Sequence, residues 1–180
     1  RLVKRKLERL IDSRLEPFRD EVFRSVDQLK FAIGEARCHL PPQAEPESLA
    51  GAEFKVFSQW GEDGIIQYLT HIVPIENRTF VEIGVENYCE SNTRFLLMKD
   101  DWAGIVIDPS DGLTRFLDET HLRWRHRIEP VQAFVTRENV NDLIARRGFR
   151  NDIGLLSIDI DGVDYWVLDA IDVVSPRILI

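Results

Sequence analysis

The sequence contains few cysteines and no long apolar run, and each shortage excludes a class of protein. Its 180 residues include only two cysteines, Cys38 and Cys89, which form neither a disulfide framework nor a metal-ligand pattern. We therefore expect a reducing, cytoplasmic setting. No apolar stretch approaches the roughly 18 residues of a membrane span, so we expect no transmembrane segment, and no basic and apolar secretory signal opens the chain.

Basic residues are scarce over most of the chain. Residues 1–37 contain ten Lys/Arg and seven Asp/Glu, whereas the remaining 143 residues contain thirteen Lys/Arg and twenty-four Asp/Glu. Because binding to nucleic acid needs clustered Lys/Arg that neutralise phosphates, this acidic body argues against a nucleic-acid-binding protein. The one basic and aromatic stretch, residues 121–127, fits either an anionic acceptor or a solvated surface.

Residues 1–37 form a separate segment, which we expect to be an amphipathic helix over residues 2–36. Its apolar side chains recur at intervals of eleven residues, about 3.67 residues per helical turn, which implies a nearly straight or slightly right-handed packed helix. The stripe consists of Leu7, Ile11, Leu15, Phe18, Val22, Val26, Leu29 and Ile33. Pro17 removes a backbone donor and predicts a kink or break near Glu16. Three uses stay open: packing on the chain's own domain, a homo-oligomer formed through residues 2–36, or a position peripheral to a membrane.

Residues 38–53 are rich in proline and small residues, which is typical of a linker. Residues 54–180 then alternate short β-branched runs with helical patterns, which predicts an α/β fold with a Rossmann-like, doubly wound, mainly parallel sheet. We expect strands at 79–83, 104–108, 128–135, 153–160 and from 177 onward, and helices at 62–73, 92–100, 113–122, 139–147 and 163–171. Since the chain stops inside the fifth strand, we expect further strands beyond it.

In such a sheet, ligands bind at the carboxyl ends of the strands, and several polar residues are expected there. Gly84 permits a sharp turn after the first strand, but a dinucleotide fingerprint also needs glycines where Glu86 and Cys89 stand. A carboxylate beside a pyrophosphate is repulsive, whereas the positive sulfonium of S-adenosylmethionine suits an acidic loop. Asp108, at the end of the second strand, is placed to accept hydrogen bonds from a ribose, or is a solvated turn residue before Pro109.

Asp159 and Asp161 are two residues apart on the expected fourth strand and should therefore face the same side. Such a pair can hold a divalent metal, or one carboxylate can act as a general base on an acceptor hydroxyl. The alternative is a structural role, as helix caps or as ion-pair partners of Arg150 or Arg177. Residues 57–64 fit either a loop that folds over a ligand or a helix N-cap anchored by Trp60.

Four segments, taken together and in order, resemble the FkbM-like class I S-adenosylmethionine-dependent methyltransferases. They are Ser58–Gly64 (SQWGEDG), Phe80–Gly84 (FVEIG), Gly104–Pro109 (GIVIDP) and Leu156–Tyr165 (LSIDIDGVDY). The resemblance covers residues 55–180. It implies a methyltransferase fold and an enzyme that methylates hydroxyl groups of sugars, polysaccharides or polyketide-type acceptors.

The resemblance also implies roles for individual residues. Glu82 and Gly84 would line the methionine end of the cofactor. Glu86, which stands where the family usually has a second glycine, is a further cofactor-binding candidate. Asp108 would hold the ribose, Gln59 would touch the cofactor from above, Ala133 or Phe134 would flank the adenine, and Asp159 and Asp161 would lie near the acceptor. A non-catalytic assembly module built on residues 2–36 is the alternative function. A metal-dependent hydrolase or hydroxylase is disfavoured, because no histidine stands at these strand ends to complete a metal site.

Overall fold

The computed structural model describes residues 2–39 and 48–180, with side chains from residue 14 onward within these ranges. The chain divides into two compact units, residues 1–41 and 42–180. Part of the segment interpreted as a linker, residues 40–47, lies outside the described residues.

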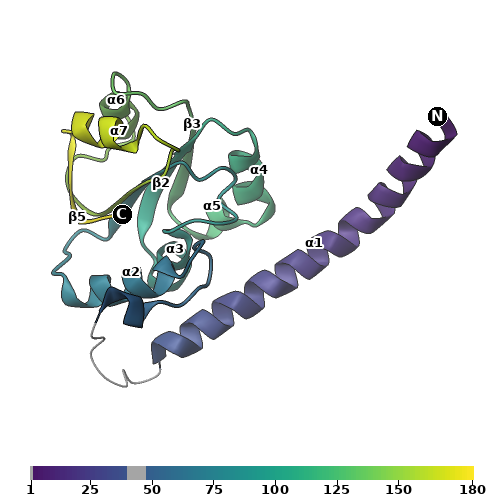
Figure 1. Cartoon of the computed structure of the whole chain (residues 1–180), viewed down its shortest axis with the longest axis horizontal. Coiled ribbons are helices and arrows are strands. Elements are labelled where there is room, and N and C mark those ends of the chain that lie inside the picture. The colour runs from purple at the N-terminus through teal and green to yellow at the C-terminus, as the bar shows by residue number, and fades with distance from the viewer. Residues whose placement is uncertain (1, 40–47) are drawn as a thin grey trace. The chain divides into compact units, whose positions relative to one another are not determined.

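The first unit is one helix, α1 (Leu2–His39; Figure 1). It runs unbroken through Pro17, so of the predicted kink or break near Glu16 the break is wrong. The side chains of residues 14–20 are all exposed, and water can therefore reach the carbonyl that loses its partner at the proline. No described helix, α1 included, has the length and apolar character needed to cross a membrane.

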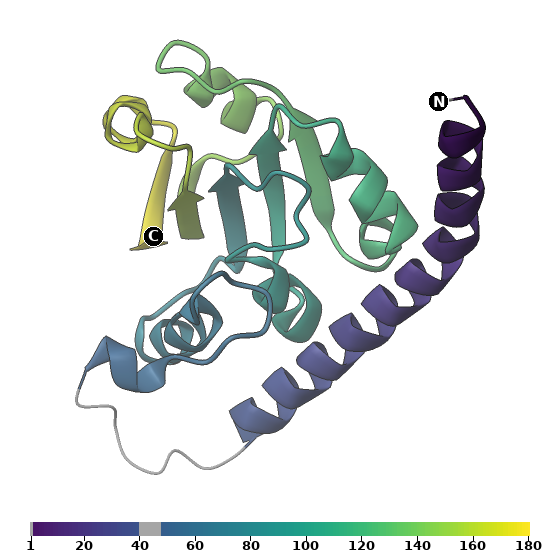
Figure 2. The same cartoon turned by 45° about the vertical axis from the view of Figure 1, so that its right-hand side comes forward.

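The second unit is built on a five-stranded sheet in the spatial order β3-β2-β1-β4-β5 (Figures 1 and 2). The strands are β1 (Thr79–Ile83), β2 (Ala103–Asp108), β3 (Ile128–Gln132), β4 (Asn151–Ile158) and β5 (Val174–Leu179). Every neighbouring pair is parallel. The predicted α/β class with a parallel sheet is confirmed.

Helices cover both faces of this sheet. They are α2 (Glu62–Ile72), α3 (Arg94–Asp100), α4 (Gly112–Glu119), α5 (Leu122–Arg125), α6 (Val140–Ala145) and α7 (Asp164–Ala170), preceded by the 3-10 turn η1 (Leu49–Ala52). One buried core packs Phe80 of β1 against α2, α3, α4 and α5. The other packs Val81 of β1 against α6 and α7. Successive residues of β1 thus face opposite cores, as expected for a strand buried on both sides.

Three boundaries differ from the prediction in ways that matter for the site. β4 ends at Ile158 instead of residue 160, and β3 ends at Gln132 instead of residue 135. The helix expected at 113–122 ends at Glu119, and α5 begins after His121, whose φ is +60°. Several of the predicted site residues therefore lie in loops just beyond strand ends.

Candidate functional site

Gly84 follows β1 at the point where the strand order reverses. β1 lies between β2 and β4, and open parallel sheets bind ligands beside such a point. Gly84 has a φ of +85°, and a Cβ at this position would lie 1.7 Å from the carbonyl oxygen of Asp159. The backbone N–H of Asp159 in turn donates to the carbonyl of Ile83 at 2.9 Å. Glycine is therefore required at residue 84 by the close approach of the backbone that follows β4.

Asp108 ends β2 and fixes the loop that follows β1, residues 84–93, which we name the β1 loop. Its Oδ2 accepts hydrogen bonds from the backbone N–H groups of Val85 (3.0 Å) and Glu86 (2.8 Å), and its Oδ1 accepts one from Ser110 (2.8 Å). The residue is only 7% exposed, so it is not a solvated turn aspartate. Since a carboxylate has about four acceptor positions, roughly one remains for a ligand.

The β1 loop contains two residues in the left-handed conformation that are not glycine. Glu86 has a φ of +48° and Tyr88 a φ of +67°. Tyr88 is fully buried, and its hydroxyl lies 2.9 Å from Thr93 Oγ1. Glu86 is exposed. Backbone conformations of this kind cost free energy and are concentrated at functional sites, which supports this loop as part of one.

Glu82 is buried beneath the β1 loop, with 3% of its surface exposed. Its Oε1 accepts a hydrogen bond from the Asn92 N–H (2.8 Å), and its Oε2 accepts from the N–H (3.1 Å) and the hydroxyl (2.5 Å) of Thr93. Burial raises the pKa of Glu82 to about 7 in spite of these bonds, and the nearby charge of Asp63 adds to the rise. Both carboxylate oxygens therefore hold the end of the β1 loop in place.

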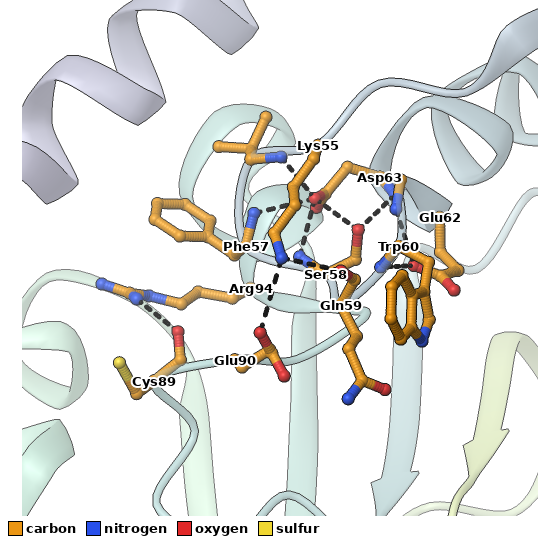
Figure 3. Close-up of polar contacts among 12 residues, drawn as sticks. Lys55, Phe57, Ser58, Gln59, Trp60, Glu62, Asp63, Cys89, Glu90 and Arg94 are labelled. Carbon is orange, nitrogen blue, oxygen red and sulfur yellow. Dashed lines mark hydrogen bonds and ion pairs between the residues drawn. The ribbon is translucent and has the colours of Figure 1, made fainter.

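A second loop, residues 55–61, which we name the α2 loop, is folded around Asp63 in the first turn of α2. Oδ2 of Asp63 accepts hydrogen bonds from the backbone N–H groups of Val56 (2.7 Å), Phe57 (2.8 Å) and Ser58 (2.7 Å) and from the Ser58 hydroxyl (2.7 Å; Figure 3). Burial raises the pKa of Asp63, although these bonds favour its charged form. One buried carboxylate thus organises half of the loop.

The preceding residue of α2 organises the other half. Oε2 of Glu62 accepts from the backbone N–H groups of Trp60 (2.8 Å) and Gly61 (2.9 Å). The side chains of Gln59 and Trp60 are exposed, Trp60 to 78%, and Figure 3 shows both pointing away from Asp63. Trp60 therefore does not anchor the loop, and its side chain and that of Gln59 extend into solvent from a well-fixed backbone.

Arg94, at the start of α3, has its charge turned inward between the two loops. It is 2% exposed, and its guanidinium carbon lies 4.0 Å from the centre of the Phe57 ring and 5.0 Å from that of Phe116. Its Nη1 donates to the carbonyl of Cys89 at 2.9 Å (Figure 3). The backbone N–H of Ser91 also donates to the Phe57 carbonyl (3.1 Å). The α2 loop and the β1 loop are thereby joined.

The structure corrects the expected placement of Asp159 and Asp161. Both follow the end of β4, Asp161 has a φ of +53°, and both are exposed. They therefore share a loop and not one face of a strand. The reason is Asp164, whose Oδ1 and Oδ2 accept from the backbone N–H groups of Ile160 (2.7 Å) and Gly162 (2.9 Å) and turn the chain into α7. These backbone bonds lower the pKa of Asp164.

Ala133 and Phe134 follow the end of β3, next to Asp108. The backbone N–H of Ala133 donates to the Asp108 carbonyl at 3.2 Å. Phe134 is 72% exposed, and its carbonyl accepts a hydrogen bond from Asn139 Nδ2 at 2.9 Å. The backbone of this segment is therefore fixed while the Phe134 ring is open to solvent beside the end of β2.

The predicted residues do not form a metal centre. Within residues 14–39 and 48–180, no group of three or more His, Cys, Asp or Glu side chains is close enough to hold a metal ion.

An open pocket lies at the opposite edge of the sheet, beside the first residues of β4 and β5, and includes Asn141, Arg150, Asn151 and Asp172. Arg177, one expected partner for the Asp159 pair, is bonded instead to Asp152 at 2.5 Å. The site residues thus gather at the carboxyl edge, away from this pocket.

Sequence reasoning missed the buried polar residues that hold the site together, namely Asp63, Tyr88, Thr93 and Arg94. An acidic residue two positions into a helix, after a loop that contains serine and glycine, is a signal that could have identified Asp63 as a loop organiser. Arg94 had no such signal, because nothing in the local sequence distinguishes a buried arginine from a solvated one.

Comparison of the chain with protein-family models, with curated proteins and with solved structures gives no match. The function must therefore be argued from the geometry of the α2 loop, the β1 loop and the strand ends.

Proposed function

We propose that residues 54–180 bind S-adenosylmethionine and belong to a methyltransferase that acts on a hydroxyl oxygen of a sugar, a polysaccharide or a similar acceptor. The observation that supports this most directly is the carboxylate of Asp108. It closes β2 and accepts hydrogen bonds from the N–H groups of Val85 and Glu86 in the neighbouring β1 loop. An acidic residue at this point of a parallel sheet suits a ribose hydroxyl.

The β1 loop argues against a dinucleotide. A pyrophosphate is usually bound by a helix N-terminus that follows the glycine turn directly. Here α3 begins at Arg94, ten residues after Gly84, and the Arg94 charge faces inward. The exposed residues of the β1 loop include the acidic Glu86 and Glu90. A positively charged sulfonium compound is compatible with this acidic turn, whereas a pyrophosphate would be repelled.

Asp108 and the exposed residues around it then take ligand-binding roles, and Glu82 and Gly84 take positioning roles. Asp108 accepts a hydrogen bond from the ribose, and Phe134, next to Ala133, flanks the adenine. Gln59 and Trp60 approach from the α2 loop. Glu86 lies near the sulfonium. Glu82 and Gly84 act indirectly, because Glu82 holds residues 92 and 93 and Gly84 admits the Asp159 backbone.

When bound, S-adenosylmethionine supplies an activated methyl group. Asp159 and Asp161 are exposed carboxylates that follow β4, and one of them accepts the proton that the acceptor hydroxyl loses. The remaining contribution of the protein is to hold the acceptor in line with the methyl group. These two carboxylates alone do not make a metal centre, so a divalent metal would activate the hydroxyl here only if oxygens of the acceptor served as further ligands.

Calorimetric titration of the full chain tests the proposal. We expect S-adenosylhomocysteine to bind and NAD to show no heat of binding. NAD binding, or the absence of binding by S-adenosylhomocysteine, would contradict it. Transfer of a labelled methyl group to a panel of glycans, with and without a chelator, then separates a metal-free enzyme, a metal-dependent enzyme and a domain that binds the nucleoside without turnover.

A further inference from the structure

The apolar stripe of α1 is open to solvent along its whole described length. Six residues of the stripe lie between positions 14 and 39, and their exposed fractions run from 45% to 68%. They are Leu15, Phe18, Val22, Val26, Leu29 and Ile33. A stripe of this length on an otherwise charged helix is typical of a helix that packs against another one.

The stripe has a symmetry that suggests the partner. On either side of Val22 the next stripe residues come at the same distances: four positions away (Phe18, Val26), seven (Leu15, Leu29) and eleven (Ile11, Ile33). A two-fold axis through Val22 therefore places each stripe position from Ile11 to Ile33 opposite a stripe position of an antiparallel copy. We propose that α1 forms an antiparallel homodimer with its two-fold axis at Val22.

Charge favours the antiparallel arrangement over the parallel one. Residues 1–14 contain six Lys/Arg and two Asp/Glu, whereas residues 15–39 contain four Lys/Arg and five Asp/Glu. A parallel pair would place two strongly basic segments side by side, and would bring Arg14 next to Arg19 of the second copy. The antiparallel pair places residues 5–14 opposite residues 30–39, which contain only two Lys/Arg and one Asp/Glu, so like-charge repulsion is smaller than in the parallel pair.

The stripe is large enough for a reversible dimer. Burying a Val, Leu or Ile side chain removes roughly 60–120 Å² of apolar surface, so the stripes of two copies bury on the order of 1,000 Å² or somewhat more. Stable interfaces begin at about 1,200 Å², and we therefore expect a dimer that dissociates on dilution. The acidic residues interleaved along residues 15–39 make an anionic membrane surface a poorer partner.

Sedimentation of the full chain at several concentrations tests the dimer. We expect a mass of about twice 20.9 kDa at high concentration. Val22→Asp, which would place two carboxylates on the axis, should give a monomer. Gln28→Asp introduces the same charge at an exposed position outside the stripe and should leave the dimer intact. A monomeric wild type, a dimeric Val22→Asp variant, or a monomer that co-sediments with anionic vesicles would overturn the proposal.

Cross-linking tests the orientation, in a variant whose Cys38 and Cys89 are replaced by serine. Val22→Cys should form a disulfide between two identical copies. Leu29→Cys alone should not, whereas a mixture of Leu29→Cys and Leu15→Cys chains should cross-link. Efficient cross-linking of Leu29→Cys to itself would indicate a parallel pair and would overturn the antiparallel arrangement.

Discussion

The carboxylate of Asp108 accepts a hydrogen bond of 2.8 Å from the backbone N–H of Glu86, 22 residues earlier in the chain. This bond ties the end of β2 to an exposed residue of the β1 loop. Glu86 has a φ of +48°, a conformation that an isolated loop would seldom adopt. Asp108 therefore supports a strained loop, and under the proposed function its remaining acceptor capacity binds the ribose.

Replacing Asp108 by asparagine should reduce both stability and nucleoside binding. The NH₂ group of asparagine would face one of the backbone N–H groups from which Asp108 now accepts a hydrogen bond, and two donors cannot bond to each other. We therefore expect a loss of about 1–3 kcal/mol in the free energy of unfolding. Binding of S-adenosylhomocysteine should weaken at least as strongly. Urea denaturation and calorimetry measure the two effects.

Asp111→Asn is the matched control for this substitution. Asp111 is exposed and makes no side-chain bond at the start of α4, so both the stability and the binding of this variant should equal those of the wild type. If Asp108→Asn bound S-adenosylhomocysteine with unchanged affinity, the ribose role of Asp108 would be wrong.

Gly84 and Gly148 provide a comparison of two glycines with the same backbone conformation. Both have a φ of +85°, but a Cβ at residue 84 would lie 1.7 Å from the Asp159 carbonyl oxygen, whereas a Cβ at residue 148 would meet nothing within 4 Å. We expect Gly148→Ala to cost about 1–2 kcal/mol for its conformation alone. Gly84→Ala should cost on the order of 4 kcal/mol or more, because the β1 loop must also move. Equal losses by thermal denaturation would show that the contact with Asp159 is unimportant.

The fold was predictable because its signals are local and regular. The β-branched run of β1 was predicted at its observed bounds, Thr79–Ile83, since such a strand is recognised from a few consecutive residues. Strand ends were less predictable. The end of β4 at Ile158 depends on Asp164, four residues beyond Ile160, which accepts the backbone N–H of Ile160 in the loop. A pattern of apolar residues does not contain that information.

The site was predictable only in part, for a related reason. The sequence identifies which polar residues stand at strand ends, and Asp108, Glu86 and Ala133 are indeed neighbours there. It does not indicate which of them are buried. Glu82 and Glu86 look alike as acidic residues near the end of β1, yet Glu82 is buried with both oxygens bonded to the β1 loop, whereas Glu86 is exposed. Whether such a residue is buried depends on hydrogen bonds to residues distant in the sequence.

The exposed aromatic residues of the site should contribute to binding without contributing to stability. Phe134 and Trp60 are 72% and 78% exposed, and stacking of a nucleobase on an aromatic ring contributes about 1–3 kcal/mol. Replacement of Phe134 by alanine should therefore weaken S-adenosylhomocysteine binding roughly 5- to 150-fold, and Trp60→Ala should weaken binding of the nucleoside or of the acceptor. The thermal stability of both variants should stay that of the wild type.

Trp124 is the control for these two variants. It is 84% exposed on α5, which precedes β3 and so lies toward the opposite end of the strand from Phe134. Trp124→Ala should change neither binding nor stability. A loss of affinity in Trp124→Ala equal to that of Phe134→Ala would indicate that the ligand binds elsewhere.

The raised pKa of Glu82 predicts how the free energy of unfolding depends on pH. Burial raises its pKa from 4.5 to about 7, so the folded protein holds a proton at Glu82 that the unfolded chain has already released. The contribution of this group to the free energy of unfolding is therefore complete below pH 4.5 and declines until about pH 7, by on the order of 3 kcal/mol at 1.36 kcal/mol per pKa unit. Urea denaturation at half-unit pH steps measures this decline.

Two variants assign the decline to Glu82. In Glu82→Gln nothing titrates at this position, so the slope between pH 5 and 7 should become shallower, even if the amide fits less well against the donors of Asn92 and Thr93. In Asp63→Asn the nearby negative charge that raises the folded-state pKa of Glu82 is removed, so the decline should still begin near pH 4.5 but should end at a lower pH and be smaller. If the slope of Glu82→Gln equalled that of the wild type, the proton held at neutral pH would belong to another group, and Glu82 would hold residues 92 and 93 as a permanent carboxylate.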